Sequence, residues 1–289
     1  MTDSADIRNT DPLSEHIIAV KERMVRTLEE TTLKRLVKDS SALVGIGGKM
    51  LRSRLAYRVG TATGVDPRLL VFGSSAVEMI HTASLLHDDV IDGGVLRRGM
   101  PTFWVEKGSA GAILLGDLLL FKAIDLICQV AGGRYTHDLV KLTGEVCEAE
   151  SEQELLLDGS DSRLEICQSI ARRKTGALFA FAAMLGGNGD TNREASLKEA
   201  GYILGTVYQL ADDILDTRGE EAGSGKTLGT DAARGIVSAA NLDESRLRNH
   251  LDTLMQEALD CLDGDPEAQR GISAYLNEDL RPALARLLD

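Results

Sequence analysis

The chain has 289 residues, 43% of them hydrophobic, which is enough to build one large domain or two small ones around a buried core. Its 45 acidic and 32 basic residues give a formal net charge of −13, which argues against nucleic-acid binding and against electrostatic attachment to anionic membranes. Four widely spaced cysteines without a CxxC pair indicate neither a disulfide framework nor a zinc site. No basic N-terminal region precedes an apolar run, so we expect a cytoplasmic protein without stable membrane insertion.

Almost every predicted element is a helix, because apolar residues recur with a period of 3.6 residues and no alternating strand pattern occurs. A flexible N-terminal tail is expected over residues 1–12. The predicted helices follow over residues 14–40, 49–60, 67–92, 109–130, 134–157, 162–186, 193–217, 243–263 and 267–287. We therefore predict an all-α protein, a single domain over 13–289 built as one large bundle of about ten helices around a deep central cavity.

The predicted helix over 67–92 ends in a cluster of three aspartates. A helix here places His81 and Asp88 on one face, with Asp92 one turn beyond and Asp89 beside them. Like charges four residues apart destabilise a helix, so the cluster requires a cation. Carboxylate oxygens without a nearby cysteine favour Mg²⁺, which binds one or two carboxylates together with substrate phosphates. The alternative, more common for a single acidic run in so acidic a chain, is a solvated surface.

A second cluster with nearly the same sequence pattern ends the predicted helix over 193–217. It comprises Asp212, Asp213 and Asp216. Carboxylates that converge across a bundle repel one another and raise one another's pKa values unless metal ions lie between them. Two or three Mg²⁺ ions could bridge the two clusters and hold a diphosphate. The alternative is a pair of independent acidic surface patches, but the matching patterns DDVID and DDILD favour convergence.

Basic residues lie beside these clusters or beside glycine turns, where a diphosphate would need positive charge. They are Lys49, Arg52, Arg97, Arg98, Lys174 and Lys226. Arginine binds phosphate through two parallel hydrogen bonds, and lysine acts as a point charge. Each alone could be an ordinary exposed cation, so the argument rests on their shared placement. His81 is either a buried core histidine or a ligand, whereas the position of Gln209, one turn before Asp212 and Asp213, favours a ligand or substrate contact.

Several motifs follow one another in the order found in a known family. They read GGKMLR at 47–52, EMIHTASLLHDDVID with RRGMPT within 78–102, KTGALF at 174–179, YQLADDILD at 208–216 and a Gly-Lys loop at 225–226. The sequence thereby resembles the trans-polyprenyl diphosphate synthases, which include farnesyl, geranylgeranyl and longer polyprenyl diphosphate synthases of the isoprenoid synthase fold. The resemblance covers about residues 43–235, roughly two-thirds of the chain.

This resemblance implies a Mg²⁺-dependent prenyltransferase that joins isopentenyl diphosphate head to tail to an allylic prenyl diphosphate and releases diphosphate. The implied ligands of two to three Mg²⁺ ions, with Mn²⁺ able to substitute, are Asp88, Asp92, Asp212 and Asp216, and Asp89 is counted with them among the catalytic residues. The isopentenyl diphosphate pocket is implied at Lys49, Arg52, His81 and Arg98. The allylic diphosphate contacts are implied at Arg97, Lys174, Thr175, Gln209 and Lys226. The family also implies a homodimer.

Product length is expected to depend on the helix that precedes the first cluster. In the family, the residues four and five before the first aspartate lie beneath the growing chain. Here they are Ser84 and Ala83, both small, with Ile80 and Met79 one turn further down. We therefore expect an open pocket and a medium- or long-chain all-trans product.

Three alternatives accompany this expectation. Ile236 stands where relatives usually carry a lysine that binds diphosphate, which would fit a non-catalytic or regulatory subunit of a heteromeric synthase. A short-chain farnesyl or geranylgeranyl synthase would share the same motifs. A terpene cyclase of the same fold would usually carry an Asn/Ser/Glu metal motif in place of DDILD.

Overall fold

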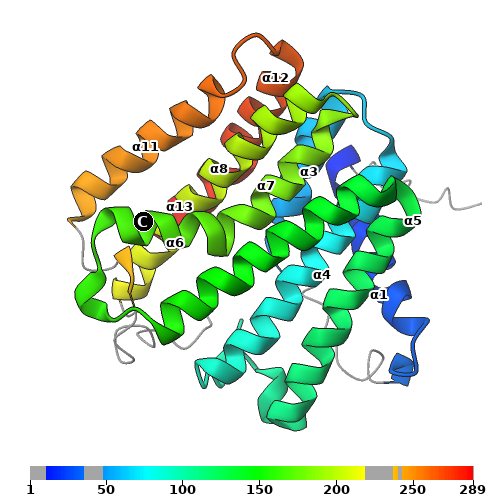
Figure 1. Cartoon of the computed structure of the whole chain (residues 1–289), viewed down its shortest axis with the longest axis vertical. Helices are drawn as coiled ribbons and strands as arrows, with labels where there is room; N and C mark the ends of the chain where they lie inside the picture. The colour runs from blue at the N-terminus through cyan, green and yellow to red at the C-terminus, as the bar shows by residue number, and fades with distance from the viewer. Residues whose placement is uncertain (1–10, 36–47, 219–236, 240–242, 289) are drawn as a thin grey trace, which may run out of the picture.

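The computed structural model describes residues 11–35, 48–218, 237–239 and 243–288 (Figure 1). Its main helices are α1 (Pro12–Glu29), α3 (Leu51–Ala62), α4 (Pro67–Ile91), α5 (Phe103–Leu155), α6 (Leu164–Ala171), α7 (Ala177–Met184), α8 (Thr191–Arg218), α11 (Glu244–Asp260), α12 (Pro266–Tyr275) and α13 (Arg281–Leu288). The all-α prediction is confirmed. One feature was not predicted, an antiparallel pair of two-residue strands, β1 (Leu96–Arg97) and β2 (Met100–Pro101), between α4 and α5.

Of the expected tail, residues 1–10 lie outside the described part of the chain, whereas Asp11 already caps α1. The single domain over 13–289 stays a prediction. Asp-Pro pairs begin three helices, α1 at Pro12, α4 at Pro67 and α12 at Pro266. In each pair the aspartate side chain accepts a hydrogen bond from a backbone N–H of the first turn, and proline occupies the position that needs no N–H donor.

Several predicted helices differ from the structure. The helix expected over 14–40 ends at Glu29 as α1, and the one expected over 267–287 consists of α12 and α13 joined by a π-helical turn, η5 (Leu276–Leu280). The helices expected over 109–130 and 134–157 are parts of α5, which already begins at Phe103 and is interrupted by positive φ angles of 79° at Gly108 and 64° at Gly132. The helix expected over 162–186 consists of α6 and α7 joined by a π-helical turn, η2 (Arg172–Gly176). Such turns inside α-helices occur frequently at functional sites, and this one carries Lys174 and Thr175.

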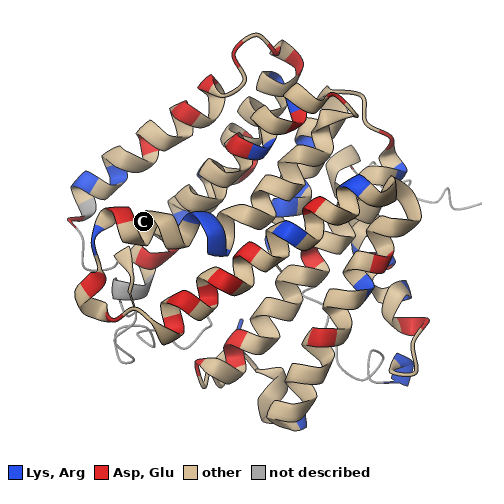
Figure 2. Cartoon of the chain, viewed as in Figure 1, with Lys and Arg blue, Asp and Glu red and all other residues tan. Residues whose placement is uncertain are grey.

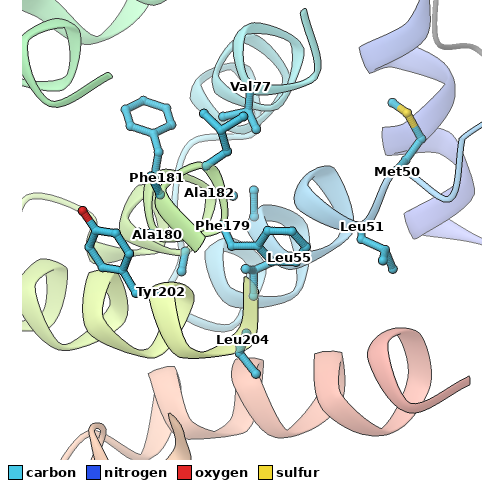
Figure 3. Packing of buried hydrophobic residues seen from close by; sticks show 14 of the residues in the cluster. Met50, Leu51, Leu55, Val77, Phe179, Ala180, Phe181, Ala182, Tyr202 and Leu204 are labelled. Atoms are coloured by element: carbon cyan, nitrogen blue, oxygen red, sulfur yellow. The ribbon is translucent and has the colours of Figure 1, made fainter. Parts of the chain in front are cut away.

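The core lies where α3, α4, α7 and α8 meet. Every residue of α7 is buried, and Figure 3 shows Phe179 and Phe181 on it together with Leu55, Val77 and Leu204 from the surrounding helices. A helix that is apolar on all sides must be enclosed by others. Within the described residues, α4 is also long and apolar enough to cross a membrane by length and composition. However, 67% of its apolar window is buried inside the bundle, as in a core helix.

Glycines bring the backbones of η2, α7 and α8 into direct contact. A Cβ atom added at Gly205 would lie 2.5 Å from the Gly176 Cα, and one added at Gly176 would lie 2.7 Å from the Tyr202 carbonyl oxygen. Larger residues would therefore push α8 away from η2. This close approach matters because it sets Thr175 on η2 against Gln209 on α8.

Candidate active site

The two aspartate clusters border one cavity of about 640 Å³. Asp88, Asp89 and Asp92 reach it from the end of α4, and Asp212 and Asp213 reach it from α8. Its volume is typical of a ligand pocket. Acidic helix ends that are far apart in the chain therefore meet across the bundle, as the repeated motif predicts.

Within the first cluster, Asp89 is buried and forms an ion pair with Arg97. The Arg97 Nη2 and Nε atoms lie 2.7 and 3.0 Å from Asp89 Oδ1. The strand pair β1–β2 turns the chain so that Arg97 can reach back to the end of α4. Thr102 and Trp104 both donate hydrogen bonds to the Gly94 carbonyl oxygen and hold this connection against α4.

The carboxyl group of Asp88 has a raised pKa. Burial, and next the nearby carboxylate of Glu150, raise the pKa of Asp88 from 3.8 to about 7. Asp92 acts in the same direction, while Lys174 and Arg97 oppose it. Figure 2 shows the acidic residues that follow the C-terminal part of α5 and the basic segment around η2 opposite them. Burial and the neighbouring carboxylates of Glu150 and Asp92 therefore disfavour the charged form of Asp88.

In the second cluster, both carboxylate oxygens of Asp213 bind the protein. Oδ1 accepts a 2.8 Å hydrogen bond from Gln209 Nε2, and Oδ2 accepts one of 3.0 Å from the Ala239 backbone N–H. Asp212 lines the cavity beside it. The side chain of Asp216 and the whole of Lys226 lie outside the described residues, so their predicted roles remain predictions.

The η2 turn places two predicted substrate contacts on the cavity wall. Lys174 Nζ lies 2.6 Å from a carboxylate oxygen of Glu150 and donates a 2.8 Å hydrogen bond to Gln153 Oε1. Thr175 Oγ1 donates a 2.6 Å hydrogen bond to Gln209 Oε1. Thr175 and Gln209 are therefore hydrogen-bonded to each other beside Asp213, and Lys174, the neighbour of Thr175 on η2, lies on the same cavity wall.

Positive charge gathers in another part of the cavity. Lys49, Arg52 and Arg98 line it, together with His81. Arg52 is buried with its guanidinium 4.9 Å from the Phe179 ring centroid. Within the part of the chain that the structure describes, its Nε has no hydrogen-bond partner, which is unusual for a buried donor. Burial, followed by the charges of Arg52, Arg97 and Arg98, holds the pKa of His81 well below its usual range, so the ring is neutral. These side chains offer donors and charge to an anion.

Several lining residues were not predicted from the sequence. Arg286 comes from α13, near the end of the chain, and Tyr208, Glu78 and Glu150 also border the cavity. No motif surrounds Arg286, so only the tertiary fold reveals it. Tyr208 immediately precedes Gln209, and Lys49 Nζ lies 5.6 Å from its ring centroid. Glu78 and Tyr208 are the first residues of the motifs EMIHTASLLHDDVID and YQLADDILD, which was the available signal.

Of the three residues predicted to limit product length, only one borders the cavity. Ser84 lines the cavity, but Ala83 and Ile80 are 0% and 2% exposed and do not border it. The side chains of Leu85, Val146 and Leu178 form apolar parts of the wall instead.

A divalent cation fits the acidic end of the cavity by the chemistry of the donors. Asp88, Asp92 and Asp212 present carboxylates there, and a cation would relieve the crowding that raises the pKa of Asp88. Within the described residues, no three Asp, Glu, His or Cys side chains are grouped closely enough to hold a metal by themselves. In proteins, Mg²⁺ typically keeps several water ligands and takes oxygens from one or two carboxylates and from substrate phosphates.

Comparison with known proteins agrees with this geometry. A family model described as polyprenyl synthetase matches residues 33–275. The chain is 35% identical over 235 residues to a geranylgeranyl diphosphate synthase of Methanosarcina mazei, covering 77% of this chain and 70% of that protein. It is 31% identical over 236 residues to an octaprenyl diphosphate synthase of Haemophilus influenzae, covering 80% and 71%.

Solved structures give the same assignment. A polyprenyl synthase from Caulobacter crescentus CB15, complexed with calcium and isoprenyl diphosphate, matches with a TM-score of 0.73 and 27% identity, covering 96% of this chain and 94% of that one. The motifs, the shared cavity and a family match over most of the chain lead to one conclusion. This chain belongs to the polyprenyl synthetase family of prenyltransferases, has the isoprenoid synthase fold and is a prenyl diphosphate synthase.

Proposed function

We propose that this enzyme joins isopentenyl diphosphate head to tail to an allylic prenyl diphosphate and extends it to a medium- or long-chain all-trans product. The observation that carries the proposal is the single cavity with an acidic part, at Asp88, Asp92 and Asp212, and a basic part, at Lys49 and Arg52. Two diphosphates of different function need two such sites, one that uses metal ions and one that uses cations of the protein.

The residues divide between the two substrates accordingly. Lys49, Arg52 and Arg98 bind the diphosphate of isopentenyl diphosphate, and Arg52 Nε, which has no partner among the described residues, supports this role. Lys174, Arg97 and Gln209 bind the allylic diphosphate beside the aspartates, and Thr175 lies next to the carbon that becomes positively charged. When bound at Asp88, Asp92 and Asp212, Mg²⁺ would act as a Lewis acid on the leaving diphosphate. Mn²⁺ would substitute, and two to three ions per site are expected.

The remaining wall supports ionisation of the allylic substrate. Leu85, Val146, Leu178 and Phe179 make the cavity apolar where the prenyl chain would lie. An apolar enclosure keeps water from the cation, and holding both substrates together removes the entropic cost of their encounter. Neutral His81 can accept or donate a hydrogen bond without adding a charge that would repel the cation.

Product length is tested by chromatography of the products made from farnesyl and isopentenyl diphosphates with Mg²⁺. We expect chains longer than geranylgeranyl diphosphate from the wild type. Ser84→Phe, which places a ring in the cavity wall, should shorten them, and Ser84→Ala should leave the length unchanged. Equal products from the wild type and Ser84→Phe would contradict the role of Ser84.

A short-chain product is the second candidate, because Ala83 and Ile80 are buried behind the cavity wall rather than open to it. Accumulation of farnesyl or geranylgeranyl diphosphate by the wild type would show that the enzyme is a short-chain synthase. If the purified chain released no diphosphate at all, it would instead be a regulatory subunit of a heteromeric synthase.

We also infer a homodimer in the cytoplasm. Ile113, Leu114 and Phe121 on α5 are 43%, 69% and 72% exposed, and Leu114 and Phe121 are two turns apart on one helix face. Such a stripe is suited to pairing with the same stripe of a second copy across a two-fold axis. The free thiols of Cys128, Cys147, Cys167 and Cys261 fit a reducing compartment.

A further inference from the structure

Gln153, near the C-terminal end of α5, joins two segments that are far apart in the chain. Its Oε1 accepts a 2.8 Å hydrogen bond from Lys174 Nζ, and its Nε2 donates one of 2.7 Å to the Val237 carbonyl oxygen. Gln153 is 9% exposed, so water does not readily replace either partner.

The orientation of this amide follows from its partners. An ammonium group can only donate hydrogen bonds and a carbonyl oxygen can only accept them. Only one of the two possible orientations of the Gln153 amide satisfies both Lys174 and Val237. A side chain without both an acceptor and a donor at this length cannot make the two contacts together.

Lys174 depends on these contacts for its position. Its flexible stem ends in an ammonium held from one side by Glu150, at 2.6 Å, and from another by Gln153. Two fixed acceptors direct the ammonium before a substrate arrives, which reduces the conformational entropy lost on binding.

The other partner of Gln153 belongs to a short buried segment, residues 237–239. Gln153, Ser162 and Asp213 form hydrogen bonds with this segment. Val237 and Ala239 are 2% and 1% exposed. Besides the bond from Gln153, Ala239 N–H donates to Asp213, and Ser238 N–H donates to Ser162 Oγ at 3.3 Å. A small cavity of about 30 Å³ is bordered by Gln153, Lys174, Asp213 and Val237, so these contacts converge at one place.

We propose that Gln153 is a positioning residue that couples the docking of segment 237–239 to the placement of the Lys174 ammonium, and thereby sets the affinity for the allylic diphosphate. This deepens the proposed function and rests on it for the role of Lys174. Gln153 was not among the predicted site residues, because residues 149–153 keep only part of the GExxQ pattern usual in the family and its partners lie 21 and 84 positions away.

A mutant cycle tests the coupling. Calorimetry measures the affinity for inorganic pyrophosphate with Mg²⁺ in the wild type, Gln153→Met, Lys174→Met and the double variant. If Gln153 acts through Lys174, Gln153→Met weakens binding about tenfold in the wild type and hardly at all in Lys174→Met. The same loss in both backgrounds, or no loss in the wild type, would overturn the proposal. Gln168→Met is the matched control, because Gln168 joins helices by a hydrogen bond to His250 and does not line the cavity.

Amide hydrogen exchange tests whether Gln153 holds segment 237–239 in place, and this measurement does not require catalytic activity. Peptides that contain residues 237–239 should exchange faster in Gln153→Met than in the wild type and Gln168→Met. Unchanged exchange would contradict the inferred contact. The proposed function fails separately, if the wild type binds Mg²⁺-pyrophosphate but forms no prenyl product.

Discussion

Asp89 and Asp213 occupy equivalent places in the two motifs, and each directs its carboxylate oxygens to the protein. Asp89 pairs with Arg97, and Asp213 holds Gln209 and the Ala239 backbone. Asp88 and Asp212 line the cavity next to them. Under the proposed function, Asp88 and Asp212 would therefore hold the metal ions, and Asp89 and Asp213 would orient the residues around them.

Substitution of the neighbouring aspartates should separate these two roles. Asp212→Asn should lower kcat by about 100-fold or more with little change in melting temperature, because a metal ligand is weakened. Asp213→Asn should lower the melting temperature and cost less activity, because the contacts to Gln209 and Ala239 are disturbed. Steady-state kinetics and calorimetry measure both, and the reverse ranking would contradict the division.

His16 predicts how stability depends on pH. Its ring is 8% exposed, lies 3.3 Å from Ser74 Oγ, and burial lowers its pKa from 6.5 to about 4. The unfolded chain binds the proton first as the pH falls, so stability contributed by neutral His16 is complete above pH 6.5 and is lost as the pH falls towards 4. The difference of 6.5 minus about 4 corresponds to about 3 kcal/mol.

Urea unfolding of the wild type and His16→Gln at several pH values measures this contribution. The difference in stability between the two proteins should shrink as the pH falls from 6.5 towards 4, because carboxylates common to both cancel. A difference that stays constant over this range would show that His16 does not titrate as the burial of its ring requires.

At the scale of elements, the crossing of η2 and α8 determines the geometry of the active site. Gly176 and Gly205 allow their backbones to touch, and Thr175 consequently reaches Gln209. The π-helical turn η2 also directs Lys174 towards Glu150 on α5. The positions of Lys174, Thr175 and Gln209 thus depend on the small residues at the crossing of η2 and α8.

Gly205→Ala should therefore weaken both folding and catalysis. The added methyl group meets the Gly176 backbone, so we expect a loss of about 1–3 kcal/mol in the free energy of unfolding and a higher KM for the allylic substrate. Gly144→Ala on α5 is the control, since its Cβ would meet no atom within 4 Å and alanine favours a helix. Equal effects of the two substitutions would contradict the argument from close approach.

The sequence predicted those parts of the site that short-range patterns encode. Asp88 and Asp92 lie at the end of one apolar helix and Asp212 and Asp213 near the end of another, and the helical period indicated the common face of Asp88 and Asp92. Gln153 was not predicted, because its segment keeps only part of the GExxQ pattern that is usual in the family, and Arg286 was not predicted, because it lies in no motif. The strands β1 and β2 are too short for an alternating pattern, and α5 continues through Gly108 and Gly132, which read as helix breakers.

At the scale of the whole molecule, the enzyme has a surface suited to self-association. Phe121→Glu should convert the proposed dimer to a monomer, because a charge would be buried against its own copy at the two-fold axis. Sedimentation velocity measures this. Leu156→Glu is the control, because Leu156 is 78% exposed, directly follows α5 and lies outside the stripe. Dissociation by Leu156→Glu instead, or a monomeric wild type, would contradict the inferred interface.

The central claim is that two distant acidic clusters act together on one metal-bound diphosphate. The most direct test is the rate of diphosphate release in single turnovers by the wild type, Asp88→Asn, Asp212→Asn and the double variant. Residues that act as one unit give strongly non-additive effects, so the double variant should be scarcely slower than the slower single variant. Losses that multiply in the double variant would show two independent sites and contradict the account.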